Sequence, residues 1–330
     1  MRHATRLPKI CVALGFPQVN QLLEMAKREM EHGSQFFEFR LDFLDDPSAG
    51  IAAIRGLLKQ HPELKILATC RRHQNHGRFN GSIEEQVALL ERAAAAGAIA
   101  VDVEIESAEA APQLVDRLRN STDLIVSYHS FIGTPPLQKL MVRLRKIPAD
   151  AYKVVTTARK PTDLLRLLSL ASEKPGTPLI LLSMGEMGFP SRVISVKMGC
   201  LYTYAAPNSA GGTAPGQISS QRMRAVYSAE KLRKDACIYG VIASPVRHSL
   251  SPQIHNRAFQ FKRIGAIYLP FLVQNGQLKD FMALADALPL KGFNVTLPHE
   301  QKIIRYLDVV DPLARRIGAV NTVWKKAGKW

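Results

Sequence analysis

The first two thirds of the chain alternate short apolar stretches with longer amphipathic ones. The short stretches are rich in β-branched and aromatic residues, as buried strands are. The longer ones repeat apolar residues every three or four positions, which is typical of helices packed on one face. We predict helices at ranges that include 19–31, 83–96, 136–146 and 162–172, and eight strands at 10–14, 36–41, 65–70, 99–105, 124–129, 151–157, 179–183 and 200–204.

Eight strands that alternate with helices between positions 9 and 227 fit an α/β (β/α)8 barrel better than an open sheet. No glycine-rich phosphate loop follows the first strand, which disfavours a dinucleotide-binding fold for this part. In a (β/α)8 barrel, functional side chains gather at the carboxyl ends of the strands. The predicted fold therefore indicates where a site should lie.

Polar side chains stand at the ends of seven of the eight predicted strands or on the loops that follow them. They are Glu38, Arg40, Asp42, Arg71, Asp102, Glu104, His129, Lys153, Ser183, Arg192, Thr213 and Gln217. A buried salt-bridge network that closes the barrel would explain the charged residues of strand two alone. It would not explain a histidine, a lysine and an arginine that converge from later strands.

Lys153 lies inside an apolar stretch that predicts a strand buried on both faces. Burial disfavours the ammonium form, so we expect a free amine near neutral pH that can attack a carbonyl and form a Schiff base. A lysine that merely extends to solvent from a strand end is the ordinary alternative. With His129 as proton shuttle and Arg192 as carboxylate ligand, the pattern indicates elimination or aldol chemistry on a small carboxylated keto compound.

Length and composition set the frame for this chemistry. A chain of 330 residues with 46% hydrophobic and 22% charged residues predicts a globular protein of two domains. No apolar run has the length of a membrane span and positions 1–9 lack a signal-peptide core, so we expect a cytoplasmic protein without a membrane partner. The four cysteines lack zinc spacing and are expected to be reduced thiols, with no metal site.

The formal net charge of +16 admits a nucleic-acid partner. The basic residues are scattered over predicted helices rather than gathered on one aromatic-rich face, so we expect no nucleic-acid binding. Excess positive charge also raises the local concentration of small anionic substrates. A small molecule is therefore the expected partner, and a homodimer is compatible with such a barrel.

Motifs along the barrel resemble, in order, those of the type I 3-dehydroquinate dehydratases. They are Glu-Phe-Arg-Leu-Asp (38–42), Thr-Cys-Arg (69–71), Ser-Tyr-His-Ser-Phe (127–131), Tyr-Lys-Val (152–154), Ser-Met-Gly (183–185) with Ser-Arg (191–192), and Ala-Pro-Gly-Gln (214–217). The resemblance implies a TIM barrel that removes water from 3-dehydroquinate with syn geometry, giving 3-dehydroshikimate without a cofactor. It makes Lys153 the Schiff-base lysine and His129 the proton shuttle. The substrate-binding residues it implies are Glu38, Arg40, Arg71, Arg192, Thr213 and Gln217.

One position departs from the family. Four residues after Arg71 the family usually carries a glutamate that partners the histidine, and this chain has Asn75. An asparagine can orient an imidazole but cannot stabilise its charged form. We therefore expect a lower pKa for His129 and reduced turnover.

A different pattern follows the charged stretch 231–235. Residues 239–256 predict a strand, a Ser-rich turn and a helix that begins near Pro252, and further β and α units follow. Ser249 and Ser251 could cap that helix, whose N-terminus would also suit a carboxylate. The motifs at 239–256, 292–299 and 318–322 resemble the substrate-binding domain of shikimate dehydrogenase. That resemblance implies that Ser249 and Ser251 hold the shikimate carboxylate and that the ring hydroxyls contact Asn294, Thr296 and Asn321.

We thus expect a dehydratase barrel at 1–230 and a shikimate-dehydrogenase substrate-binding domain at 236–330. Glu300 occupies the position of the family's catalytic lysine, and Lys302 comes two residues late. The chain ends before the family's NADP-binding domain, so a complete dehydrogenase would need NADP and further residues. Either the gene is cut short or the chain is the front portion of a bifunctional enzyme.

Two other functions fit parts of the pattern. A class I aldolase also uses a barrel lysine, but Arg192 and the Ala-Pro-Gly-Gln motif argue against it. A catalytically impaired shikimate- or quinate-binding protein is suggested by Asn75 and Glu300. Such a protein would bind its ligand without forming an imine.

Overall fold

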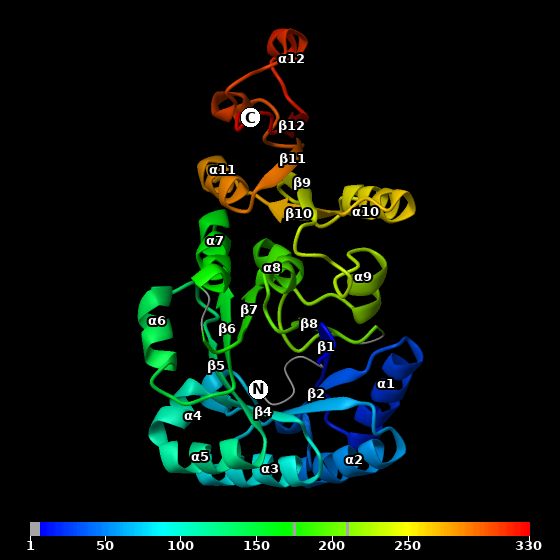
Figure 1. Cartoon of the computed structure of the whole chain (residues 1–330), viewed down its shortest axis with the longest axis vertical. Coiled ribbons are helices and arrows are strands. Elements are labelled where there is room, and N and C mark those ends of the chain that lie inside the picture. Colours follow the sequence, from blue (N-terminus) through cyan, green and yellow to red (C-terminus); the bar gives the residue numbers. More distant parts are fainter. Residues whose placement is uncertain (1–6, 174–175, 209–210) are drawn as a thin grey trace.

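In the computed structural model, which describes residues 7–173, 176–208 and 211–330, two units lie one above the other along the long axis (Figure 1). The lower unit is a sheet of eight parallel strands in the order β7-β6-β5-β4-β3-β2-β1-β8. Its strands are β1 (Ile10–Leu14), β2 (Phe36–Arg40), β3 (Lys65–Thr69), β4 (Ala100–Glu104), β5 (Asp123–His129), β6 (Ala151–Thr157), β7 (Leu179–Met184) and β8 (Thr203–Ala205). A bond from Leu201 N to Leu179 O brings the two outer strands together, so the barrel is nearly closed.

Helices surround the barrel, as the alternating pattern predicts. They are α1 (Val19–Glu31), α2 (Pro47–Gln60), α3 (Ile83–Ala95), α4 (Ile105–Ala110), α5 (Pro112–Ser121), α6 (Leu137–Leu144), α7 (Pro161–Ser169), α8 (Gly185–Lys197) and α9 (Ser220–Ala225). Their apolar faces pack on strands that are buried on both sides. The predicted (β/α)8 architecture is confirmed.

The eighth strand is shorter than predicted and lies later in the chain. The apolar run suggested 200–204, whereas β8 spans Thr203–Ala205. Gly199 ends α8 with a positive φ of 101°, and the Cys200 N–H bonds back to Ser195 O. The residues after Gly199 therefore complete the end of a helix before the strand begins.

The upper unit is a four-stranded sheet with the order β10-β9-β11-β12, in which only β12 runs antiparallel to its neighbour. Its elements are β9 (Cys237–Ala243), α10 (Ser251–Lys262), β10 (Ala266–Leu272), α11 (Leu278–Ala287), β11 (Leu290–Val295), the 3-10 turn η5 (Lys302–Tyr306), α12 (Pro312–Ile317) and β12 (Thr322–Trp324). The predicted second α/β unit is confirmed, with its first helix beginning one residue before Pro252. No helix in the described ranges is long and apolar enough to cross a bilayer.

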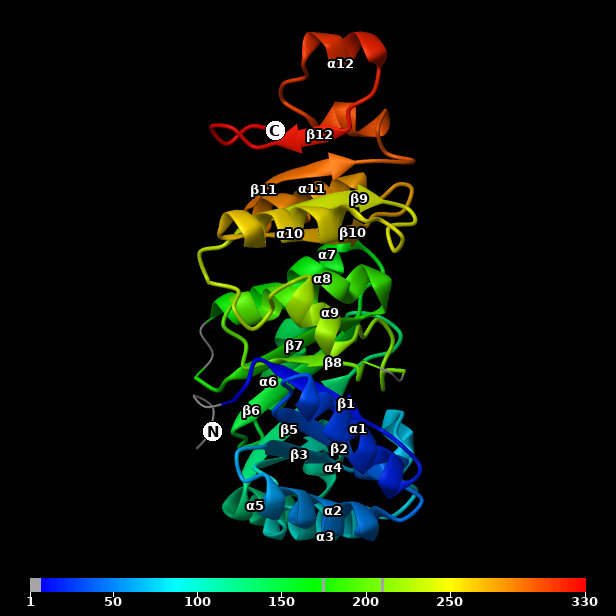
Figure 2. The ribbon, with the colours of Figure 1, turned by 90° about the vertical axis from the view of Figure 1, so that its right-hand side faces the viewer.

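The two units share an apolar core. Helices α7 and α8 lie against α11 and β10 (Figure 2). Leu168 and Phe189 of the barrel belong to the same buried cluster as Phe271 and Phe281 of the upper unit. At its edge, Thr162 Oγ1 donates to Asp280 Oδ1 at 2.6 Å. The junction is therefore packed like a protein interior.

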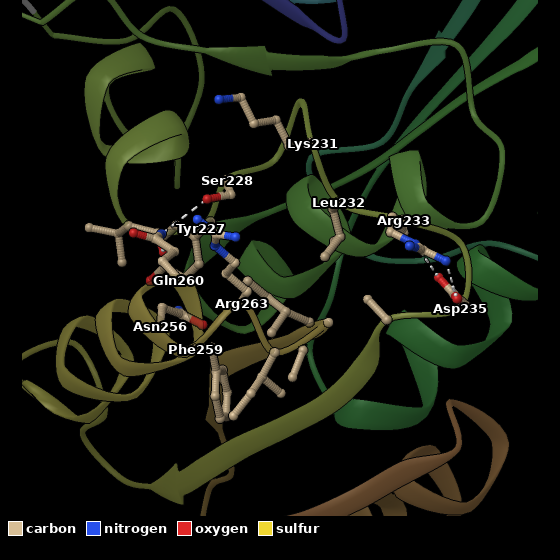
Figure 3. A pocket seen from close by; sticks show the side chains of 16 residues that line it. Tyr227, Ser228, Lys231, Leu232, Arg233, Asp235, Asn256, Phe259, Gln260 and Arg263 are labelled. Atoms are coloured by element: carbon tan, nitrogen blue, oxygen red, sulfur yellow. Dashed lines mark hydrogen bonds and ion pairs between the residues drawn. The ribbon is translucent and has the colours of Figure 1, made fainter.

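A cavity of about 470 Å³ opens beside the linker between the units (Figure 3). Gln260 joins its two walls, since its Nε2 donates to Ser228 Oγ and Ala225 O, both at 3.0 Å. Arg233 on its rim pairs with Asp235 at 2.7 Å. A second cavity, at the carboxyl ends of the barrel strands, is polar and shares no residue with this one.

Candidate active site

All eight residues predicted for the barrel site line one cavity at the carboxyl ends of the strands. They are Glu38, Arg40, Arg71, His129, Lys153, Arg192, Thr213 and Gln217. They come from β2, β5, β6, α8, the loop after β3 and the loop after β8. Four of them are arginine or lysine and one is glutamate, so the lining favours an anionic ligand.

Lys153 lies in the middle of β6 and is 4% exposed. Its Nζ donates to Asp102 Oδ2 at 2.9 Å and to the Tyr204 hydroxyl at 3.0 Å, and lies 3.6 Å from Glu38 Oε1. Its nitrogen thus lies at the cavity among fixed partners instead of extending to solvent. The alternative of a lysine that snorkels from a strand end does not hold.

Asp102, on β4, anchors the charges beneath the cavity. Besides Lys153, its carboxylate accepts from Arg71 Nη2 at 3.0 Å and from Ser127 Oγ at 2.6 Å. Burial alone would raise the pKa of Asp102, but the Lys153 ammonium and the Arg71 guanidinium hold that pKa well below its usual range. Asp102 therefore stays ionised and fixes the lysine and the arginine in place.

His129 ends β5 and receives a hydrogen bond from Arg71, with 2.8 Å between Nη1 and His129 Nε2. A guanidinium can only donate, so Nε2 accepts and the ring is neutral. Burial lowers the pKa of His129 well below its usual range, and the charges of Arg71 and Lys153 lower it further. Its buried Nδ1 has no hydrogen-bond partner among the described residues.

Asn75 does not take the place expected for a partner of His129. Its Nδ2 donates to Glu106 Oε2 on α4 at 2.9 Å. The next residue, His76, has a φ of 60° and lines the cavity, with its ring 4.1 Å from that of Phe131. The expected direction of the His129 pKa shift is right, but burial and neighbouring cations cause it.

Arg192 is 1% exposed and sits within α8. Its Nη2 donates to Pro215 O at 3.1 Å, while its buried Nε has no partner. No carboxylate pairs with it in the described chain, and burial lowers its pKa to about 10. Arg40, in contrast, has both arms on Asp42, at 2.9 and 2.7 Å. The cavity thus contains a guanidinium that lacks an anion.

The loop after β8 supplies neutral polar groups. Thr213 N donates to Gln217 Oε1 at 2.8 Å, and Gln217 Nε2 lies 3.4 Å from Thr213 Oγ1. This pairing holds an amide and a hydroxyl at the rim of the cavity, where they suit substrate hydroxyls.

Four predicted strand-end residues do not line the cavity, and Asp102, described above, is one of them. Ser183 Oγ bonds to Thr156 O, Asp42 holds Arg40, and Glu104 accepts from Gln86. In β7 the neighbours of Ser183 line the cavity instead, because successive strand side chains alternate between faces.

Sequence reasoning also missed several residues that line the cavity, among them Tyr204, Phe131 and His76. Tyr204 is hard to recognise, because a tyrosine in an apolar run is typical of an ordinary strand. Within the described ranges, no group of three His, Cys, Asp or Glu side chains could hold a metal ion, and all four cysteines are free thiols.

Tyr268 connects residues of the second predicted site. Its hydroxyl donates to Asn294 Oδ1 at 2.6 Å and is hydrogen-bonded to Ser251. Asn294 Nδ2 in turn lies 3.3 Å from Asn321 O. Ser249 joins the group through a 3.3 Å bond from Ser251 N to its Oγ. Four of the five predicted residues are thus linked, and Tyr268 was not predicted.

Three further residues of the upper unit lie near this group in sequence. Thr296 is exposed and bonds through its backbone to Ile242 O. Lys302 Nζ donates to Asn275 Oδ1 at 3.4 Å, and the Glu300 carbonyl accepts from Val320 N. The contacts described for Lys302 therefore do not include this group.

Comparison with known proteins finds two families along the chain. Residues 10–234 match the model of the type I 3-dehydroquinases, and residues 241–323 match that of the shikimate dehydrogenase substrate-binding domain. A 3-dehydroquinate dehydratase of Dehalococcoides mccartyi is 34% identical over 67% of this chain and 94% of its own length.

Two relatives cover both units. A chloroplastic bifunctional 3-dehydroquinate dehydratase/shikimate dehydrogenase of Arabidopsis thaliana is 32% identical over 96% of this chain, which spans 52% of that relative's length. The structure of dehydroquinate dehydratase and shikimate dehydrogenase from S. pombe AroM matches with a TM-score of 0.56 at 26% identity, over 98% of this chain and 63% of that one.

Proposed function

Because the chain belongs to the type I 3-dehydroquinase family, we propose that its barrel converts 3-dehydroquinate into 3-dehydroshikimate through a Schiff base on Lys153. This reaction is a lyase step of the shikimate pathway of aromatic amino acid biosynthesis. The observation that carries the proposal is the buried Lys153 amine, which shares one cavity with the neutral His129 and the unpaired Arg192.

The reaction follows from the roles that these groups can take. Arg192 binds the substrate carboxylate, and the Lys153 amine, once its ammonium form has lost a proton, attacks the keto carbon, which loses its oxygen as water. The iminium nitrogen then draws electrons from the adjacent carbon, and His129 removes a proton there through Nε2, which exchanges its hydrogen bond from Arg71 for that proton. The electron pair expels the hydroxyl group from the carbon that bears the carboxylate, and His129 returns its proton to that leaving group. Water finally hydrolyses the imine and frees Lys153.

The remaining residues of the cavity position these groups. Arg71 holds His129 through Nε2 and Asp102 through Oδ1. Because the same histidine takes up and returns the proton, the hydrogen and the hydroxyl leave from one face, which is syn elimination. Thr213 and Gln217 are assigned to substrate hydroxyls, with Glu38 and Arg40 around them.

Trapping with sodium borohydride tests this proposal. Reduction in the presence of 3-dehydroquinate should abolish dehydratase activity and leave a covalent adduct on Lys153 in peptide mass spectrometry. Lys153→Met should give no adduct. Binding of 3-dehydroquinate without any adduct on the wild-type protein would refute the proposal and favour the second candidate, a shikimate- or quinate-binding protein. Asn75 supports that candidate, because it bonds to Glu106 and is not a partner of His129.

For the second unit we propose binding of a shikimate-like carboxylate by Ser249, Ser251, Asn294, Thr296 and Asn321. The match at 241–323 and the hydrogen bonds around Tyr268 support this assignment and a division into 1–230 and 236–330. We propose shikimate dehydrogenase activity, with NADP, only for a longer protein that would include an NADP-binding domain, and not for residues 236–330 by themselves. The sequence from 236 to 330 contains no glycine-rich phosphate loop, and Glu300 stands at the position of the family's catalytic lysine.

We propose further that the protein works in the cytoplasm as a homodimer, on small molecules alone. Cell fractionation tests the location, and analytical ultracentrifugation tests the oligomeric state. Binding of the purified protein to DNA or RNA at physiological salt would contradict the proposal that it acts on small molecules alone.

A further inference from the structure

Tyr204 contacts the reactive nitrogen of the barrel site. It lies in β8 and is 3% exposed. Its hydroxyl is 3.0 Å from Lys153 Nζ and 3.3 Å from Glu38 Oε1. Lys153 and Glu38 themselves are 3.6 Å apart, which is too long for a direct hydrogen bond. The phenol therefore bridges a lysine and a carboxylate that do not otherwise bond.

The other carboxylate beside Lys153 is a poor acceptor for its proton. Asp102 also accepts from Arg71 and Ser127, and protonation would weaken these bonds. Although burial acts in the opposite direction, Lys153 and Arg71 hold the pKa of Asp102 well below its usual range. Glu38 accepts from the neutral hydroxyls of Thr69, at 2.8 Å, and Tyr204. Of the two carboxylates, Glu38 is the better terminal acceptor.

We propose that Tyr204 is a catalytic residue that relays a proton between Lys153 and Glu38 during imine formation and hydrolysis; this inference rests on the proposed dehydratase function. In the forward step an N–H bond of the Lys153 ammonium breaks and an O–H bond forms on the phenol oxygen. The original phenol O–H bond breaks and one forms on Glu38. The products are a neutral amine, a neutral phenol and a neutral carboxylic acid.

The same path returns the proton when it is needed. After the amine has attacked the keto carbon, the carbinolamine hydroxyl must leave as water. Glu38 passes its proton through Tyr204 to that hydroxyl, the C–O bond breaks, and Glu38 regains its negative charge opposite the iminium. Burial, and next the charge of Glu38, raise the pKa of Tyr204 well above its usual range. The phenol thus passes a proton on in one concerted shift and does not ionise.

Tyr204→Phe keeps the ring and removes only the relay oxygen. We expect the rate of imine formation, measured by rapid quenching with borohydride and 3-dehydroquinate, to fall on the order of 100-fold, as for loss of a general acid–base group. Substrate affinity should change little. Tyr202→Phe is the matched control, because Tyr202 is equally buried and its hydroxyl contacts that of Tyr204 at 3.4 Å. It should form the imine at the wild-type rate.

A second assay tests the proton relay without 3-dehydroquinate, so its result does not depend on the proposed substrate. Formaldehyde with cyanoborohydride methylates Lys153 through the same carbinolamine and imine steps, and mass spectrometry follows its rate. Slower methylation in Tyr204→Phe than in Tyr202→Phe supports the relay even if 3-dehydroquinate forms no adduct, a result that would refute only the proposed function. Equal methylation rates would overturn the relay. If Tyr204→Phe does not fold, Glu38→Gln tests the same path by removing its terminal acceptor, and an unchanged rate would again overturn it.

Discussion

Arg192 shows at the scale of one residue how function and stability oppose each other. Its guanidinium is 1% exposed, and the described chain supplies no carboxylate for it. A buried cation without a counter-ion destabilises a fold, and a ligand carboxylate that reaches it gains strong charge-assisted hydrogen bonds. The residue is therefore better suited to the bound state than to the free protein.

We predict that Arg192→Met weakens substrate binding and stabilises the fold. Loss of a charged hydrogen bond worth roughly 2 kcal/mol should raise KM about 30-fold. Removal of the unpaired charge should raise the free energy of unfolding by about 1–3 kcal/mol, measured by urea denaturation. Arg145→Met is the control, since Arg145 is exposed and 3.9 Å from Glu173, and it should change neither quantity by much. An unchanged KM for Arg192→Met would contradict its role at the carboxylate.

The depressed pKa of His129 predicts where activity is lost in acid. A base with a pKa below its usual value stays unprotonated at neutral pH, so the acid limb of kcat/KM should lie below about pH 6.5. Rates measured between about pH 5 and 8 test this. An acid limb above about pH 6.5 would mean that His129 is not the base in the free enzyme.

Stability should follow the same group. In the unfolded chain His129 takes up a proton at its ordinary pKa, whereas in the folded protein it does so only at a lower pH. The stabilisation is therefore complete above about pH 6.5 and is lost as the pH falls toward the folded-state pKa. His129→Asn should remove this part of the pH dependence of unfolding.

At the scale of elements, the sequence predicted β1, β6 and α1 with the observed bounds. Buried parallel strands are continuous apolar runs, and the helices between them have a clear apolar face. The same reasoning placed β8 too early, because Cys200, just after Gly199, bonds back to Ser195 O and completes the C-terminal end of α8. Strand ends located the eight cavity residues, but the partners of each side chain could not be predicted. Asn75 is an example, since its pairing with Glu106 depends on how two loops meet.

Asn75→Glu should therefore give no gain in turnover. Asn75 now donates to Glu106, and a glutamate at that position would face a like charge within a few ångströms. We expect kcat to stay the same or fall, and Asn75→Glu combined with Glu106→Gln to recover the wild-type kcat. A several-fold increase from the single substitution would show that this position does reach His129.

Two loops at the mouth of the barrel are tied to the upper unit. Gln277 Nε2 donates to Arg159 O at 2.9 Å, and Arg159 Nε donates to Ile132 O at 2.5 Å. Phe131, next to Ile132, lines the cavity. A contact before α11 is thus transmitted to the loop after β5 that follows His129 directly.

Gln277→Ala should accordingly impair the dehydratase from outside its cavity. Loss of a hydrogen bond worth about 1 kcal/mol should raise KM about fivefold at nearly constant kcat. Gln274→Ala is the matched control, because its exposed side chain makes no described bond. Equal KM values for the two variants would show that the upper unit does not position this loop.

At the scale of the whole molecule, the shared core should make the two units unfold together. Leu168 and Phe189 of the barrel belong to one buried cluster with Phe281 of the upper unit. Separation of the units would expose this apolar surface to water, which strongly disfavours a state with only one unit folded. A cooperative transition gives coincident curves for different spectroscopic signals.

The positions of the tryptophans allow the unfolding of the two units to be followed separately. Both of its tryptophans, Trp324 and Trp330, lie in the upper unit, whereas most helices belong to the barrel. In urea, tryptophan fluorescence and far-ultraviolet circular dichroism should give the same midpoint. Leu168→Ala, which leaves a void in the shared core, should lower both midpoints together by an amount equivalent to about 2–5 kcal/mol. Val142→Ala, at an exposed barrel position, should lower neither. A fluorescence transition that precedes the dichroism transition and does not respond to Leu168→Ala would mean that the upper unit unfolds independently.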